Sequence, residues 1–133
     1  MKRAVQWTMG SMLIICALAG CRGPKPASVA LSKEEVILRD AQPERVFTGM
    51  LGGEPVHLVT HDCVVYMIKD DTEWEKVLEP EFYPSFMLCD RQSLRADGDK
   101  VIATLGRMAF GAGGCCASGG TYRTTDGRNW QKF

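Results

Sequence analysis

The chain has little histidine, since its 133 residues include only His57 and His61. It also lacks a serine in a nucleophile-elbow context: Ser118 lies in CCASGG, and the residue two positions before it is Cys116 rather than glycine. A Ser-His-Asp hydrolase is therefore not expected. The glycine-rich stretch has no lysine and no G-K-[ST] ending that would bind a phosphate. We predict that the protein is not an enzyme.

The N-terminal segment lacks an apolar run long enough to span a bilayer. Residues 11–19 (SMLIICALA) make a nine-residue run, whereas a spanning helix needs about 20 residues. Lys2 and Arg3 precede the run, and the segment closes with Leu18-Ala19-Gly20-Cys21. Positive charge, apolar run, small residues and cysteine in this order are typical of the export signal of a bacterial lipoprotein. We expect residues 1–20 to be removed as a signal peptide.

Cys21 then becomes the first residue of the mature chain. We expect its thiol to carry a diacylglycerol and its freed amine an acyl chain, which together anchor the protein in a membrane, facing the periplasm. The next residue is Arg22, and because aspartate there marks retention in the inner membrane of enteric bacteria, arginine favours the outer membrane. No cofactor besides this covalent lipid is expected. Residues 21–32 are predicted to be a lipidated tether, and residues 33–133 a single β-rich periplasmic domain.

A surplus of positive charge is also absent. Without Lys2 and Arg3, the mature chain has 14 basic and 16 acidic residues, a net charge of −2 with neutral histidines. It contains no tract of five or more basic residues. Because binding to a phosphate backbone calls for a clustered basic surplus, nucleic acid is not expected as a partner.

The domain keeps four cysteines after Cys16 leaves with the signal and Cys21 is lipidated. They are Cys63, Cys89, Cys115 and Cys116. An even number in an oxidising compartment indicates two disulfides rather than a metal site. Adjacent residues of an extended segment point to opposite sides, so we expect Cys63 and Cys89 each to bond one member of the adjacent pair.

Short apolar and β-branched runs separated by turn signals make up most of the domain after Pro43. The predicted strands cover residues 45–51, 55–60, 63–69, 82–89, 101–105, 121–125 and 130–133. The run 64–68 (VVYMI) is apolar on both faces, as expected of a central strand. We predict a mostly β domain: a small antiparallel sheet, curled or sandwich-like and disulfide-stapled, with at most one or two short helices.

Two segments leave alternatives open. Residues 33–41 (KEEVILRDA) suit one or two helical turns, although VIL also suits a short strand. Residues 70–81 (DDTEWEKVLEPE) place Trp74, Val77 and Leu78 at helical spacing, which suits a short helix or a long exposed loop.

His57, His61 and Cys63 are candidate metal ligands, although Cys63 is also a candidate for a disulfide. These residues alternate with Val59 on one face of a predicted strand, so they could share a metal ion. Because Cys63 is needed for a disulfide, only two histidines remain, and no metal is expected.

An acidic segment that contains a tryptophan is the candidate partner-binding surface. It consists of Asp70, Asp71, Glu73, Trp74 and Glu75. An exposed aromatic framed by charge suits an interface. The structural alternative is a solvated loop with Trp74 tucked into the core.

The C-terminal segment 121–130 (TYRTTDGRNW) combines hydroxyl residues with Asp126, Gly127 and Trp130. It resembles the closing β-hairpin of Asp-box proteins, in which such residues shape a tight turn. Asp126 and Trp130 are four positions apart, one fewer than in the standard box. The resemblance implies a structural hairpin, and a single copy cannot make a propeller.

A longer series of short motifs runs through the chain. The lipobox is followed by Cys63-Val64-Val65-Tyr66, an acidic turn, Asp97-Gly98, the glycine-rich segment 113–120 and a terminal Y-x-x-x-D-G-x-x-W. In this order the motifs resemble the small periplasmic immunity lipoproteins that neutralise lipase effectors of type VI secretion systems. The resemblance implies a non-enzymatic protein that binds a secreted lipase toxin and blocks its active site or its membrane engagement. It also implies a bond from Cys63 to Cys115 or Cys116, whereas Cys89 departs from the family pattern.

The leading hypothesis is therefore a membrane-anchored immunity protein that neutralises a secreted (phospho)lipase by stoichiometric binding. The alternative is a small envelope lipoprotein with a structural or assembly role. A phospholipase-like gene beside this one favours the first hypothesis, and an envelope-assembly operon favours the second.

Overall fold

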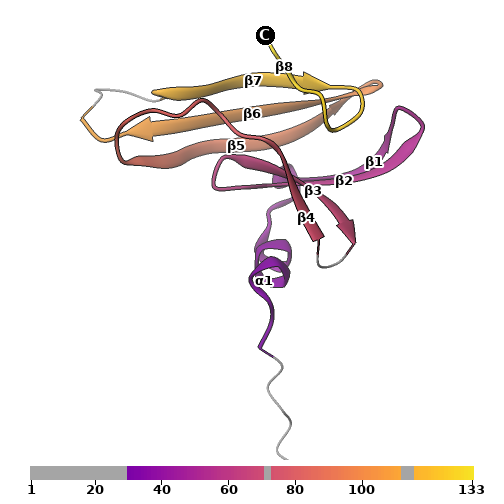
Figure 1. Ribbon diagram of the computed structural model, residues 1–133. Helices are drawn as coiled ribbons and strands as arrows, with labels where there is room; N and C mark the ends of the chain where they lie inside the picture. Colours follow the sequence, from indigo (N-terminus) through magenta and orange to yellow (C-terminus); the bar gives the residue numbers. More distant parts are fainter. Residues whose placement is uncertain (1–29, 71–72, 112–115) are drawn as a thin grey trace, which may run out of the picture. The chain divides into compact units, whose positions relative to one another are not determined.

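The chain folds as two four-stranded antiparallel sheets that share one core (Figure 1). The computed structural model describes residues 30–70, 73–111 and 116–133. The first sheet contains β1 (Val46–Leu51), β2 (Glu54–His61), β3 (Val64–Asp70) and β4 (Glu73–Leu78), and the second contains β5 (Met87–Asp97), β6 (Lys100–Ala109), β7 (Ser118–Thr124) and β8 (Gln131–Lys132). Neighbouring strands follow one another in the chain, so each sheet is a simple meander. The prediction of a mostly β, sandwich-like, disulfide-stapled domain is confirmed.

The core consists of inward-facing side chains from both sheets. The first sheet contributes Leu51, Val56, Leu58, Val65 and Met67, and the second contributes Leu94, Val101, Ala103, Leu105 and Tyr122. Every second residue of a strand faces the same side, which gives these residues their spacing. Leu58 and Val101 are completely buried, and burying one such side chain contributes about 1.5–3 kcal/mol. The two sheets therefore stabilise each other.

Two-residue turns join the first three strands. Gly52 and Gly53 have φ of 59° and 84°, and Asp62 and Cys63 have φ of 50° and 57°. Two central residues with positive φ are typical of the type I′ turn, whose twist matches that of the flanking strands. Glycine adopts this conformation without steric cost, whereas at Cys63 the left-handed backbone costs about 1–2 kcal/mol. The predicted strand 63–69 therefore begins one residue later, and Cys63 lies in the turn.

One short helix, α1 (Lys33–Asp40), and a 3-10 turn, η1 (Pro43–Arg45), precede β1. Ser32 caps α1: its hydroxyl accepts from the Glu35 N–H at 3.1 Å, and the Glu35 carboxylate accepts from the Ser32 N–H at 2.7 Å. This reciprocal capping box stabilises the first helical turn, so the helical alternative for residues 33–41 holds. No helix in the described part of the chain has the length and apolar character to cross a membrane.

The segment 73–78 forms strand β4, so the prediction of a helix or loop over residues 70–81 is wrong. β4 pairs with β3, with Trp74 opposite Ile68 and Leu78 opposite Val65. Register shifts interrupt this pairing, and Val77 is the extra residue beside Leu78. The bulge breaks the two-residue alternation. As a result, the apolar residues of this strand have a spacing that imitates a helix.

Strand β5 differs most from its prediction, because it begins at Met87 and continues to Asp97, whereas a strand over residues 82–89 was expected. Cys89 pairs with Arg107, but Arg91 pairs with the adjacent Gly106, so Asp90 is an extra residue in β5. This bulge reverses which side chains face the core. Cys89 therefore points toward the first sheet, whereas Arg91 points outward.

Candidate partner-binding surface

Two carboxylates of the predicted acidic segment, those of Glu73 and Glu75, pair with cations of the same molecule. Glu75 Oε2 lies 2.6 Å from Arg128 Nη1 and 3.1 Å from Lys69 Nζ, and Glu73 Oε1 lies 3.6 Å from Lys69 Nζ. Hydrogen bonds from Arg128 and then Lys69 lower the pKa of the Glu75 carboxyl. Glu75 therefore ties β4 to the turn that follows β7.

Trp74 is half-buried on the outward face of the first sheet. Its ring lies 5.6 Å from the Tyr66 ring, centroid to centroid. The indole N–H is buried and finds no acceptor among the described residues. Of the neighbouring acids, Asp70 ends β3, and Asp71 lies outside the described residues. A partner-binding role for this segment stays a prediction.

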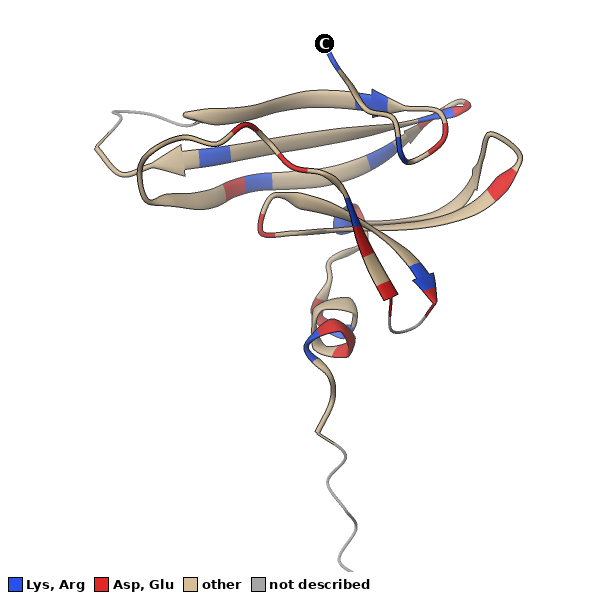
Figure 2. Cartoon of the chain, viewed as in Figure 1, with Lys and Arg blue, Asp and Glu red and all other residues tan. Residues whose placement is uncertain are grey.

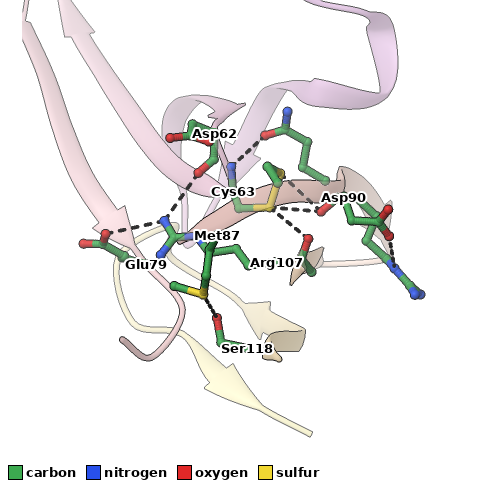
Figure 3. Close-up of a disulfide and its surroundings, with 11 residues drawn as sticks. Asp62, Cys63, Glu79, Met87, Asp90, Arg107 and Ser118 are labelled. Carbon is green, nitrogen blue, oxygen red and sulfur yellow. Dashed lines mark hydrogen bonds and ion pairs between the residues drawn. A yellow bond between two sulfur atoms is a disulfide. The ribbon is translucent and has the colours of Figure 1, made fainter. Parts of the chain in front are cut away.

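A disulfide joins Cys63 to Cys89, whose Cα atoms are 5.3 Å apart (Figure 3). It links the β2–β3 turn to β5 and so connects the two sheets covalently. The prediction that these cysteines bond Cys115 and Cys116 is wrong, because packing of the sheets brings the β2–β3 turn against β5. The bond spans 26 positions, and closing a loop of this size contributes roughly 3–4 kcal/mol.

Polar contacts hold the strained turn at Cys63 in place (Figure 3). The Cys63 N–H donates to Gln92 Oε1 at 3.1 Å. Its Sγ lies 3.3 Å from the carbonyl oxygens of Arg91 and Gly106. A disulfide sulfur carries no hydrogen, so these two are close packing contacts rather than hydrogen bonds. Cys63 is fully buried.

Arg107 adds a polar link beside the disulfide (Figure 3). Its guanidinium donates to the Asp62 carbonyl oxygen at 3.4 Å and lies 3.5 Å from the Glu79 carboxylate. The side chain of Arg107 is only 14% exposed. Arg107 therefore connects β6 both to the β2–β3 turn and to the segment after β4.

Of the other predicted cysteine sites, Cys116 lies among the described residues and two do not. Cys21, the predicted lipid site, and Cys115 lie outside the described residues. Cys116 is disulfide-bonded, and its Sγ lies 2.7 Å from where a Cβ on Gly106 would stand. A side chain at position 106 would collide with this sulfur, so the close approach requires glycine.

Asp126 organises the turn between β7 and β8. Its Oδ1 accepts the backbone N–H groups of Arg128 and Asn129, both at 2.8 Å, and the Thr124 hydroxyl at 2.9 Å. The Asn129 side-chain amide, followed by these backbone groups, holds the pKa of Asp126 well below its ordinary value. A carboxylate that accepts several N–H bonds is stabilised in its charged form.

The same turn packs into the first sheet through Gly127. This residue is buried with φ of 77°. A Cβ on it would lie 2.8 Å from Met67 Cε and 3.1 Å from Val56 Cγ1. The Trp130 indole N–H donates to the Gly127 carbonyl at 3.2 Å. Asp126, Gly127 and Trp130 thus form a structural hairpin that contacts the opposite sheet.

The two histidines lie on β2, at positions 57 and 61. The sulfur of Cys63 is occupied by its bond to Cys89 and cannot ligate as a thiolate. Over residues 30–70, 73–111 and 116–133, no group of three or more histidine, cysteine, aspartate or glutamate residues could hold a metal ion.

An exposed apolar cluster lies where β5 begins and β6 ends. The rings of Phe86 and Phe110 are 5.6 Å apart, and these residues are 70% and 61% exposed. Leu88 is 45% exposed beside them, and Phe82 in the β4–β5 connection is 86% exposed. Sequence analysis missed this cluster because it placed the segment in a strand. The available signal was Pro84 among three aromatic residues, which argues against a regular strand.

Comparison with known proteins gave no match to a family model, a curated protein or a solved structure.

Proposed function

We propose that this chain is a membrane-anchored periplasmic immunity protein that neutralises a type VI secreted (phospho)lipase by stoichiometric binding. The observation that supports binding most directly is the exposed cluster of Phe86, Leu88 and Phe110, in which the two phenylalanine rings are 5.6 Å apart. Apolar groups that cluster in contact with water favour association with a partner that can bury them. The lipoprotein-type signal and the order of the motifs support the membrane location and the class of toxin.

The disulfide supports the proposal because it restrains the cluster. Cys89 follows Leu88 directly in β5, and its bond to Cys63 fixes this end of the strand to the first sheet. Phe110 is held as well, since its N–H donates to the Phe86 carbonyl at 3.3 Å. A surface that is ordered before association loses less conformational entropy when it binds.

Neutralisation by binding needs no catalytic group in this chain. A lipase must present an apolar groove to the acyl chain of its substrate, and exposed phenylalanine side chains are suited to occupy such a groove. A bound inhibitor then excludes lipid from the groove. The expected lipid on Cys21 would hold the inhibitor at the membrane where a lipase acts. Cys21→Ser should therefore weaken protection in cells and leave binding in solution intact.

The test is a titration of the purified mature domain, carrying Cys21→Ser, into the lipase encoded beside its gene, with phospholipase activity as the readout. Loss of activity at a one-to-one ratio would support the proposal. An unrelated phospholipase at equal activity is the control, because sequestration of the substrate would slow both enzymes. Undiminished activity without a complex would contradict the proposal and favour a structural or assembly role.

A further inference from the structure

The second sheet has an outward face over which no described helix or strand lies, although Cys116 packs against Gly106 there and Ile102 is buried between its neighbours. Residues directly opposite one another in an antiparallel pair share a face, so the register defines the rows of this face. From one end to the other, the rows are Phe86 and Phe110; Leu88 and Met108; Arg91, Gly106 and Gly119; Ser93, Thr104 and Thr121; and Arg95, Ile102 and Arg123. At about 3.3 Å per residue, the face runs roughly 25 Å along the strands.

The chemistry of this outward face changes from one end to the other. The first two rows are apolar, the third holds Arg91 beside two glycines, the fourth carries three hydroxyl side chains, and Arg95 and Arg123 flank Ile102 at the far end. Basic residues recur on all three long strands of the second sheet (Figure 2). Protein interfaces are enriched in phenylalanine, methionine and arginine relative to other surfaces. The composition of the face is therefore typical of an interface.

The two arginines at the far end are exposed. Neither Arg95 nor Arg123 takes part in an ion pair with a described residue. The Arg123 guanidinium lies 5.3 Å from the centre of the Phe133 ring, a contact that leaves its charge uncompensated. Arg107 and Arg128, by contrast, pair with carboxylates of the same molecule. The charge of Arg95 and Arg123 is thus available to an acidic partner.

We propose that the outward face of the second sheet is the surface that docks the protein partner. The partner presents an apolar pocket bordered by carboxylates: Phe86 and Phe110 enter the pocket, while Arg95 and Arg123 pair with the carboxylates. This inference rests on the proposed function, because it takes the partner to be the lipase. The mature chain carries a net charge of −2, so the positive end is a local feature that steers an acidic partner to this face.

The observations favour a protein over a membrane as the occupant. Ser93, Thr104 and Thr121 separate the apolar end from Arg95 and Arg123, and hydroxyl groups in fixed rows match the directional hydrogen bonds of a folded partner. Asp97 lies on the same face beyond Arg95, opposite Lys100. Charges of both signs therefore lie side by side at this end, which suits a folded partner with matching charges better than a uniformly anionic lipid surface.

The test compares variants of the full mature domain for affinity to the lipase encoded beside its gene. Phe86→Ser with Phe110→Ser removes the apolar end, and Met50→Ser is its control, since Met50 is 61% exposed on the first sheet. Arg95→Glu reverses charge at the basic end, and Lys33→Glu does so in α1. We expect at least roughly 30-fold weaker binding from the phenylalanine pair and about tenfold from Arg95→Glu, mainly through slower association. The controls should stay within about twofold.

Each outcome decides the assignment. A wild-type domain that does not bind the lipase would overturn both the proposed function and this surface. Wild-type binding that persists unchanged in both face variants would overturn the surface alone. If the phenylalanine pair does not fold, Leu88→Ser serves in its place, with Met50→Ser still as control. Binding to vesicles of phosphatidylglycerol and phosphatidylcholine that the variants lose, while lipase binding persists, would replace the protein partner by a lipid surface.

Discussion

Two links join the sheets at opposite ends of β2, and they differ in chemistry. Beyond the end of β2, the disulfide ties Cys63 to Cys89. Near its start, Gly127 packs against Val56 within a turn organised by Asp126. The covalent link restrains the unfolded chain as well as the folded one, whereas the packed turn exists only in the folded state. One link should therefore respond to redox conditions and the other to pH.

The largest difference should come from removing the covalent link. Cys63→Ala with Cys89→Ala is expected to lower the free energy of unfolding by roughly 3–4 kcal/mol, because the unfolded chain regains its loop entropy. Urea unfolding of the oxidised proteins measures this change. A loss below about 1 kcal/mol would show that the polar contacts around Cys63 hold the two sheets together without the bond.

The packed turn can be broken by a single methyl group. Gly127→Ala should cost about 2–3 kcal/mol, because the new Cβ crowds Val56 and the end of the buried Met67 side chain in addition to the strain of positive φ. Gly98→Ala is the matched control: its φ is 62° but nothing lies within 4 Å of the new Cβ, so about 1 kcal/mol is expected. Equal losses in the two variants would mean that the turn does not press on the first sheet.

The stability that Asp126 gives to the turn should depend on pH. The native pKa of Asp126 is lowered, so its contribution is complete above the unfolded value near pH 4 and is lost as the pH falls toward the native pKa. Asp126→Asn should cost about 1–2 kcal/mol at pH 7, and this difference should shrink below pH 4. Unfolding series from pH 7 to pH 2.5 measure it. A difference that stays constant over that range would refute the role of the charge.

The smallest effect is expected from the ion pairs that join the turn to β4. Glu75→Gln should lower the free energy of unfolding only slightly, since the pairs are solvent-exposed. Any loss should vanish near 1 M salt. Glu54→Gln, at an exposed residue without an ion pair among the described residues, is the control. A larger loss that persists in salt would show that Glu75 is needed for packing.

A strand with a continuous apolar run was predictable from the sequence, and the strands in which an extra residue disturbs the pattern were not. The run 64–68 is apolar on both faces, and it forms most of β3. β4 was missed because the extra residue Val77 disturbs its period. β5 was cut short because residues 90–93 are all polar and offer no apolar signal between Cys89 and Leu94. The spacing of apolar residues does not predict the bounds of a strand whose irregular register is set by tertiary packing.

The cysteine pairing and the exposed face were also beyond the sequence. Chain order does not show that the β2–β3 turn lies against β5, so nothing in the spacing selects Cys63–Cys89 over the pairing with Cys115 and Cys116. The exposed face needs the register, because Phe86 and Arg123 are far apart in the chain and share a surface only through β6. The Asp126 hairpin was predictable because its signals are local.

The extra residue Asp90 decides which side chains at the start of β5 face solvent and which face the first sheet. If Asp90 were paired regularly instead of bulging, with the register after it kept, the two-residue alternation would turn over every side chain before it. Leu88 would be directed into the interior and Cys89 into solvent, away from Cys63. A single unpaired residue thus lets the same short segment both anchor the first sheet and display apolar groups. A one-residue slip of this segment along β6 would remove the disulfide and the apolar surface together.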